Sequence, residues 1–176
     1  AGPAGLMLAC ELRVAGVDAV VVDRLGERRP VAPGIGVNAS SVELLEQRGI
    51  LDSLRDKMFP LPMVQFAMLM LDMAKVPERN RGAMLLLQSN LELALERRAL
   101  DLGVQIRRGH EVVSLDQDED GVTAGLRADG AVSAFRCRFL VGCDGAQSTV
   151  RQLAGIGTTT TAVPFYGITG EVEMAF

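Results

Sequence analysis

The sequence predicts an α/β fold, in which a parallel sheet flanked by helices is crossed by a three-stranded antiparallel meander. Three observations support this fold class. The glycine turn at Gly2 and Gly5 runs directly into an apolar helix, and a valine-rich run over 17–22 is typical of a strand buried in a parallel sheet. Three alternating segments between 112 and 135 are separated by Asp-Gly pairs, which is the pattern of consecutive hairpins.

The composition excludes several classes of protein. A chain of 176 residues, with 48% hydrophobic and 23% charged residues, suits one globular domain with a real core. The net charge of −4 argues against a nucleic-acid partner. No apolar run approaches the roughly 20 residues that a membrane helix needs. We therefore expect neither nucleic acid nor a membrane among its partners.

The reactive side chains are few. Cys10, Cys137 and Cys143 lack CxxC or metal-ligand spacing, so we expect reduced thiols in a cytoplasmic protein and no metal site. His110 is the only histidine, which excludes a histidine metal cluster and a Ser-His-Asp triad. No side chain is assigned as catalytic. Arginine pairs at 28–29, 97–98 and 107–108 stand beside acids and are interpreted as solvated surface.

The opening turn carries the main binding signal. Gly2 and Gly5, with Pro3 and Ala4 between them, match the second and third glycines of a dinucleotide fingerprint. A glycine at position 2 would let backbone approach a pyrophosphate, and one at position 5 would let the helix pack closely on its strand. Asp23 ends the first strand about twenty residues later and would accept hydrogen bonds from ribose hydroxyls. A plain polar strand end is the competing interpretation of Asp23.

The remaining elements follow from local pattern. Asn38 or Ser40 is expected to cap a helix, and Ser89 and Glu92 form a capping box for a longer one. The methionine-rich stretch over 63–73 is interpreted as one strand whose side chains serve packing, with a substrate-contacting wall as the alternative. Helices are expected over 6–15, 42–48, 50–58, 89–102 and 149–154, and strands over 17–22, 63–73, 84–87, 104–106, 112–115, 122–126, 132–135, 139–141 and 165–174.

Four local motifs together resemble the group A flavoprotein monooxygenases, and within them the polyketide and antibiotic hydroxylases. The first is the glycine turn with the strand that ends at Asp23, and the second joins 34–36 to the segment 42–50. The third joins Gln88 to the segment 91–109. The fourth is Gly142-Cys143-Asp144-Gly145 continuing to Arg151, the Asp-Gly motif of that family.

The resemblance implies a Rossmann-like FAD-binding domain of the glutathione-reductase type, with FAD and NADPH as cofactors. Gly2, Pro3, Ala4 and Gly5 would then face the FAD pyrophosphate. The other implied cofactor-binding positions are Asp23 and the adjacent Arg24 at the ribose, Gln88 near the ribityl or phosphate portion, Val112 near the adenine, and Asp144, Gly145 and Arg151 at the pyrophosphate.

The resemblance also implies a reaction. In such enzymes NADPH reduces the flavin, O₂ adds to give a C4a-hydroperoxide, and one oxygen atom is placed on an aromatic substrate. Pro33 and Ser40 stand where relatives commonly carry arginines, and Asp23 replaces the usual glutamate. A fragment that binds FAD without turnover and a same-fold epoxidase or reductase are the alternatives, and a homodimer is an open option.

The resemblance further predicts the domain organisation. Residues 1–160 are expected to form the FAD-binding domain, with 63–81 an excursion toward the substrate side. Residues 161–176 would begin a substrate-binding domain. The chain is expected to be the first portion of such an enzyme, incomplete at both ends.

Overall fold

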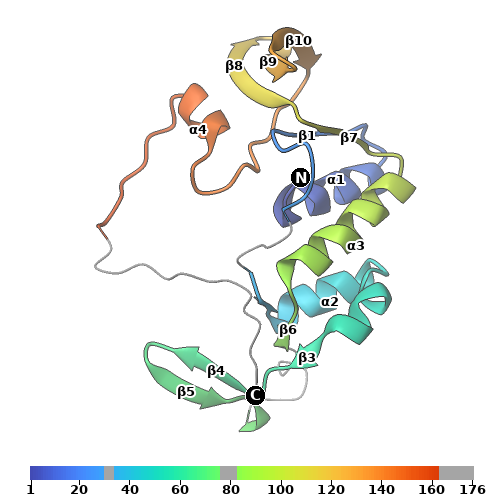
Figure 1. The fold of residues 1–176 in the computed structure, drawn as a ribbon, viewed down its shortest axis with the longest axis vertical. Coiled ribbons are helices and arrows are strands. Elements are labelled where there is room, and N and C mark those ends of the chain that lie inside the picture. Colours follow the sequence, from blue (N-terminus) through green and yellow to red (C-terminus); the bar gives the residue numbers. More distant parts are fainter. Residues whose placement is uncertain (30–33, 76–82, 163–176) are drawn as a thin grey trace, which may run out of the picture.

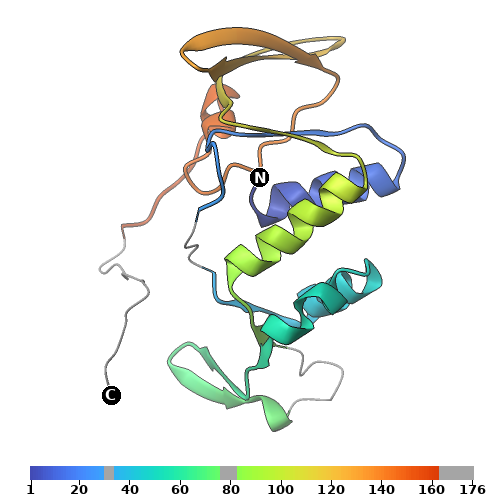
Figure 2. The same cartoon turned by 45° about the vertical axis from the view of Figure 1, so that its right-hand side comes forward.

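The computed structural model describes residues 1–29, 34–75 and 83–162. Figure 1 shows three parts along the long axis: the antiparallel meander at the top, a group of helices in the middle and a separate hairpin at the bottom. The same order is visible after a 45° turn in Figure 2. The strand predicted over 165–174 and the position Pro33 lie outside the described residues.

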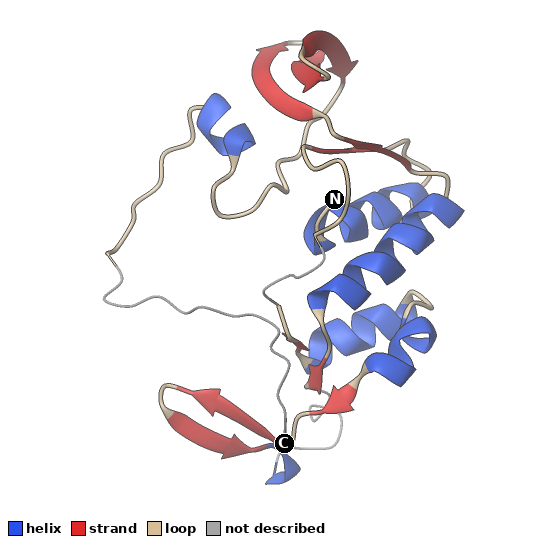
Figure 3. Ribbon diagram, in the orientation of Figure 1, coloured by secondary structure: helices blue, strands red, loops and turns tan. Residues whose placement is uncertain are grey.

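Two helices form the centre of the core. α1 (Pro3–Val14) packs against α3 (Gln88–Asp101), and α2 (Ala39–Gln47) and the 3-10 helix η1 (Leu51–Lys57) extend the same cluster. The fully buried side chains with the largest volume are Leu6, Leu54, Leu86 and Leu95. Figure 3 shows these helices, in blue, grouped between the strands.

The parallel sheet is smaller than predicted. β1 (Val20–Asp23) pairs with β7 (Gln105–Arg108), and Asp23 stands opposite Arg108 in the register. Within the described ranges this is the only parallel pair. With two strands and little cover, β1 is only half-buried, so the expected strand with both faces buried is wrong.

The meander confirms its prediction. β8 (Glu111–Asp118), β9 (Gly121–Ala128) and β10 (Ala131–Cys137) form an antiparallel sheet in the order β10-β9-β8. Asp129 and Gly130 both have positive φ, as the two-residue hairpin turn requires. The first turn lies one position earlier than expected, because Asp118 pairs with Gly121.

The methionine-rich stretch is a hairpin rather than one strand. β4 (Met63–Phe66) and β5 (Leu69–Asp72) pair through a turn at Ala67 and Met68, and the 3-10 helix η2 (Met73–Lys75) follows. Both turn residues have positive φ, at 48° and 67°. Neither is glycine or asparagine, so the sequence carries no turn signal at this point.

Two other local predictions are wrong. The strand expected over 139–141 is an irregular segment, with Phe139 and Val141 exposed and no strand beside it in the part of the chain that the structure describes. The capping box at Ser89 does not form, because α3 begins at Gln88 and the Glu92 carboxylate accepts from the Gln88 side chain instead.

The remaining elements agree with expectation to within a few residues. The Asn38 side chain caps α2 and the Ser148 side chain caps α4 (Thr149–Leu153), each by accepting a backbone N–H. β6 (Met84–Leu85) pairs antiparallel with β2 (Gly36–Val37) and β3 (Phe59–Pro60). None of the described helices is long and apolar enough to cross a membrane.

Candidate functional site: the start of α1

The first turn of α1 presents backbone N–H groups without a side-chain cap. Gly2 is the N-cap, Pro3 takes the first helical position, and the first turn contains no acidic residue. The Leu6 amide donates to the Gly2 carbonyl at 3.0 Å, so the amides of Ala4 and Gly5 precede the first intrahelical bond. Such a helix start is suited to binding an anion.

The chain's own packing does not require glycine at position 2. Gly2 has φ −82° and ψ 178°, a conformation that any residue adopts. A Cβ built there would meet no atom within 4 Å. The open space in front of this residue is the room that a phosphate group needs to approach the helix start.

Gly5 brings the fourth motif beside the first. A Cβ at Gly5 would lie 3.3 Å from the Cβ of Cys143, so the turn that carries Asp144 lies against α1 at this point. The sequence separates these residues by more than a hundred positions. The structure therefore places two of the four motifs together.

Asp23 lies at the same place, at the end of β1. The Ala1 nitrogen donates to its Oδ2 at 2.5 Å and the Leu25 amide to its Oδ1 at 2.9 Å. Burial raises the pKa of the Asp23 carboxyl, and the hydrogen bond from the Leu25 amide and the charge of Arg108 act in the opposite direction. Asp23 is thus a half-buried carboxylate at the start of α1.

The Asp144 carboxylate accepts two hydrogen bonds from residues of its own segment. Its Oδ1 accepts from the Ser148 hydroxyl and its Oδ2 from the Val150 amide at 3.1 Å. Burial raises the pKa of the Asp144 carboxyl, and these hydrogen bonds outweigh that effect and lower it. Asp144 therefore joins the exposed 142–145 turn, which includes Gly145, to the start of α4.

Arg151 does not contact the Asp144 carboxylate directly. Its Nη1 donates to the Ala146 carbonyl at 3.0 Å, and its Nε is buried without a hydrogen-bond partner among the described residues. A buried donor without an acceptor is costly. The support of Asp144 by Arg151 therefore stays a prediction.

Gln88 is held within the protein. The Gly34 amide donates to its Oε1 at 3.0 Å, its own amide donates to the Gly34 carbonyl at 2.8 Å, and its Nε2 donates to Glu92 at 2.7 Å. A Cβ at Gly34 would lie 2.6 Å from the Gln88 Oε1, which explains the glycine there. Gln88 lies at the start of α3, beside β6, and the described contacts do not join it to the α1 site.

Arg24 and Val112 complete the predicted set. Arg24 is exposed, next to Asp23, and Val112 is half-buried at the irregular start of the β8–β9 pairing. Ser40, where relatives carry arginine, is exposed on α2. No group of three metal-ligating side chains was found in the described ranges, and Cys10, Cys137 and Cys143 are free thiols there.

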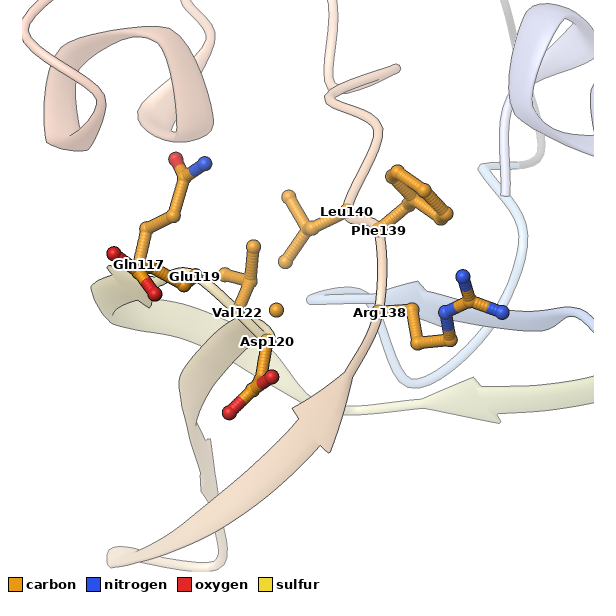
Figure 4. Close-up of a pocket in the computed structure, with 8 residues that line it drawn as sticks. Gln117, Glu119, Asp120, Val122, Arg138, Phe139 and Leu140 are labelled. Carbon is orange, nitrogen blue, oxygen red and sulfur yellow. The ribbon is translucent and has the colours of Figure 1, made fainter.

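A pocket of the described surface lies elsewhere. A pocket of about 300 Å³ opens between the β8–β9 turn and the segment after β10, and Figure 4 shows the residues around it. Its lining contains none of the predicted cofactor residues: Gln117, Glu119, Asp120, Gly121, Val122, Arg138, Phe139 and Leu140. The candidate site is therefore the start of α1 and not this pocket.

The sequence pattern did not identify the charged residues that lie close to Asp23. Arg108 was assigned to solvated surface, but its side chain is only 18% exposed and pairs with Glu96 and Asp23. The signal in the sequence was the position of Arg108 at the end of a strand, which becomes informative only once β7 is known to pair with β1.

Comparison with known proteins identifies the family. The profile of a family described as FAD binding domain matches residues 1–174. The chain belongs to this family. At the start of α1, the uncapped helix amides and the open space at Gly2 are features that would suit the pyrophosphate of FAD.

Two curated relatives show the range of the family. The dialkyldecalin synthase of Streptomyces rugosporus is 42% identical over 98% of this chain and 37% of its own length. The 12-dehydrotetracycline 5-monooxygenase/anhydrotetracycline 6-monooxygenase of Streptomyces rimosus is 44% identical over 89% of this chain and 31% of its own. The chain thus spans about a third of the length of these relatives.

A solved structure gives the same fold. The anhydrotetracycline hydroxylase OxyS from Streptomyces rimosus superposes with a TM-score of 0.82 at 42% identity, covering 88% of this chain and 32% of that one. The mixed arrangement of parallel and antiparallel sheets is therefore the fold of this FAD-binding family.

Proposed function

We propose that this chain is the FAD-binding part of an NADPH-dependent monooxygenase that uses O₂ to hydroxylate an aromatic substrate of polyketide or phenolic type. Family membership supports FAD as the cofactor. The observation that carries the assignment of the site is the bare start of α1, with open space at Gly2 beside the Asp23 carboxylate. The tetracycline monooxygenase relative supports the reaction class.

Different residues of the site would bind different parts of the cofactor. The amides at the start of α1 bind the pyrophosphate, and Asp23 accepts hydrogen bonds from the adenosine ribose. Asp144 joins the 142–145 turn, which lies against α1 at Gly5, to the start of α4, and Arg151 follows on α4 as a further residue for the pyrophosphate. When bound, the flavin would carry electrons from NADPH to O₂, so that one oxygen atom enters the aromatic ring and the other leaves as water.

The rest of the chain would serve the same reaction. Gln88 lies toward the ribityl portion and the backbone of Val112 toward the adenine. The excursion over 63–81 would serve the substrate side, and residues 161–176 would begin the substrate-binding domain beyond the FAD-binding domain of 1–160. Of these two segments, residues 76–81 and 163–176 lie outside the described residues. We propose a Rossmann arrangement of the glutathione-reductase type. We also propose a cytoplasmic location, which the free thiols of the described cysteines support. A homodimer stays a prediction.

One relative favours a second candidate. The dialkyldecalin synthase matches as much of this chain as the monooxygenase does and at nearly equal identity. The described residues therefore suit a synthase that binds FAD as well as a monooxygenase. The relatives do not favour a same-fold reductase, an epoxidase or a fragment without turnover.

The test uses the full-length protein. Its visible absorption spectrum reports bound flavin, and NADPH consumption is followed with and without phenolic and polyketide substrates. We expect flavin absorbance, faster NADPH consumption with substrate, and a product heavier by one oxygen atom. A product isomeric with its substrate, formed without NADPH, would favour the synthase, and a colourless protein that FAD does not stabilise would contradict the proposed cofactor site.

A further inference from the structure

Four charged side chains form a cluster behind the start of α1. Asp23 at the end of β1 faces Arg108 at the end of β7, with Oδ2 and Nη1 3.9 Å apart. Arg108 donates through Nε and Nη2 to Oε1 of Glu96, at 3.2 and 2.9 Å. The other oxygen of Glu96 forms an ion pair with Arg28, with Oε2 and Nε 3.0 Å apart.

The cluster is built into the sheet. Asp23 and Arg108 stand opposite each other in the parallel register, and the His110 amide donates to the Asp23 carbonyl at 2.9 Å. The side chains of Asp23, Arg108 and Glu96 are each only 17–18% exposed. Charges that are this little exposed attract each other more strongly than charges in water, so these ion pairs are stronger than pairs on the open surface.

Arg108 attracts the Asp23 carboxylate without occupying any of its hydrogen-bond acceptor positions. A separation of 3.9 Å is too long for a hydrogen bond. Each Asp23 oxygen accepts one donor from the chain, the Ala1 nitrogen or the Leu25 amide, and a carboxylate oxygen has room for a second. Capacity for two further hydrogen bonds is therefore left on Asp23.

Glu96 fixes the position of Arg108. Both of the Arg108 hydrogen bonds go to one oxygen of Glu96, and Arg28 neutralises the other. Glu96 thus anchors the guanidinium while Arg28 limits repulsion between Glu96 and Asp23. The guanidinium is held close to Asp23 but is prevented from forming a closed pair with it.

We infer that Arg108 is a positioning residue for the adenosine ribose: anchored by Glu96, it holds the Asp23 carboxylate in the orientation that faces the ribose hydroxyls. The inference rests on the proposed role of Asp23 in FAD binding. It adds a specific prediction: because Arg108 acts through Asp23, its substitution should change the affinity only for nucleotides that carry the ribose hydroxyls.

The test measures nucleotide binding to the full-length apoprotein by calorimetry, with two probes. ADP carries both ribose hydroxyls, and 2′,3′-dideoxyadenosine diphosphate carries neither. In the unaltered protein we expect ADP to bind about tenfold or more tightly than the dideoxy analogue. Asp23→Asn should remove most of that preference, and Arg108→Gln should reduce it several-fold while leaving the affinity for the analogue unchanged.

Arg107→Gln is the matched control. Arg107 is the neighbour of Arg108 on β7, but its guanidinium lies over the ring of Phe135 at 4.9 Å and has no contact with Asp23. We expect this variant to keep the full preference for ADP. If Arg108→Gln does not fold, Arg108→Lys, which keeps the charge but not the paired hydrogen bonds to Glu96, takes its place and should show a smaller loss.

The outcomes separate the inference from the proposed function. If neither the unaltered protein nor Asp23→Asn distinguishes the two nucleotides, the ribose role of Asp23 fails. If Asp23→Asn loses the preference but the Arg108 variant keeps it, only the inference is overturned. An equal loss for both nucleotides in the Arg108 variant would also overturn it, because Arg108 would then act through general structure. In the double variant, the Arg108 substitution should add almost nothing.

Discussion

Gly2 is a residue whose identity the contacts of the chain do not explain. Its backbone conformation accepts any side chain and a Cβ there meets open space. We therefore expect Gly2→Val to fold normally and to lose most FAD binding by steric exclusion, with the flavin absorbance of the purified full-length protein as the measurement. Gly157→Val is the control, since Gly157 also has open space around it. Full flavin occupancy in Gly2→Val would show that the motif is structural only.

Asp118 makes the meander sensitive to acid. Hydrogen bonds from Arg136 and from the Asp120 amide lower the pKa of its carboxyl from 3.8 to about 2. A carboxyl whose folded pKa is lowered stabilises the fold above its unfolded pKa, and this contribution is lost as the pH falls through about 2.

In Asp118→Asn, the stability lost between pH 4 and pH 2 should accordingly be smaller than in the unaltered chain. Urea unfolding at a series of pH values measures this. Asp56→Asn, at an exposed position, controls for the change in net charge. An unchanged pH slope in Asp118→Asn would contradict the assignment.

The candidate residues at the start of α1 could be predicted from local spacing in the sequence, whereas the charged residues that tertiary pairing brings beside Asp23 could not. Gly2, Gly5 and Asp23 follow from a short fingerprint whose spacing is physical. Arg108 and Glu96 lie 85 and 73 positions beyond Asp23. The pairing of β1 with β7 places Arg108 opposite Asp23, and Glu96 reaches Arg108 from α3. An arginine beside acids looks the same in sequence whether it is solvated or buried.

At the scale of elements, sequence signals succeeded where a turn residue or cap was distinctive. Asp129-Gly130 gave the second hairpin and Asn38 gave the cap of α2. The hairpin β4–β5 was missed because Ala67 and Met68 adopt positive φ without any residue that favours it. One face of this hairpin is entirely apolar, with Val64 opposite Leu71 and Phe66 opposite Leu69. The alternation of apolar and polar residues therefore did not reveal the turn either.

The β4–β5 turn should be improvable. Positive φ costs an ordinary residue roughly 1–2 kcal/mol, and the type of turn needed here favours Asn-Gly. Replacing Ala67 with Asn and Met68 with Gly should therefore stabilise the hairpin by about 1 kcal/mol or more. Amide hydrogen exchange of β4 and β5 measures this locally, and Asp129→Ala, at a site that also has positive φ, should lower protection in the meander. Faster exchange in the Asn-Gly variant would contradict the turn geometry.

At the scale of the whole molecule, stability depends on the contact between α1 and α3. Leu95 is 1% exposed in this core, whereas Leu100 on the same helix is 55% exposed. Leu95→Ala should lower the free energy of unfolding by about 2–5 kcal/mol, because it removes buried surface and leaves a cavity. Leu100→Ala should change it by less than about 0.5 kcal/mol. Similar losses in denaturant unfolding for the two variants would show that the helices do not pack as described.

The pairing of β1 with β7 also has a consequence for how the chain acquires its structure. Residues Val20 and Gln105 are neighbours in the sheet but 85 positions apart in sequence, whereas the meander strands are joined by two-residue turns. Closing the long loop costs more chain entropy than closing a turn, so the meander should gain protection first and β1 should join last. The carboxylate at the end of β1 is then among the last groups set in place. A newly made chain would pass through a stage with an ordered meander and no ability to hold a nucleotide.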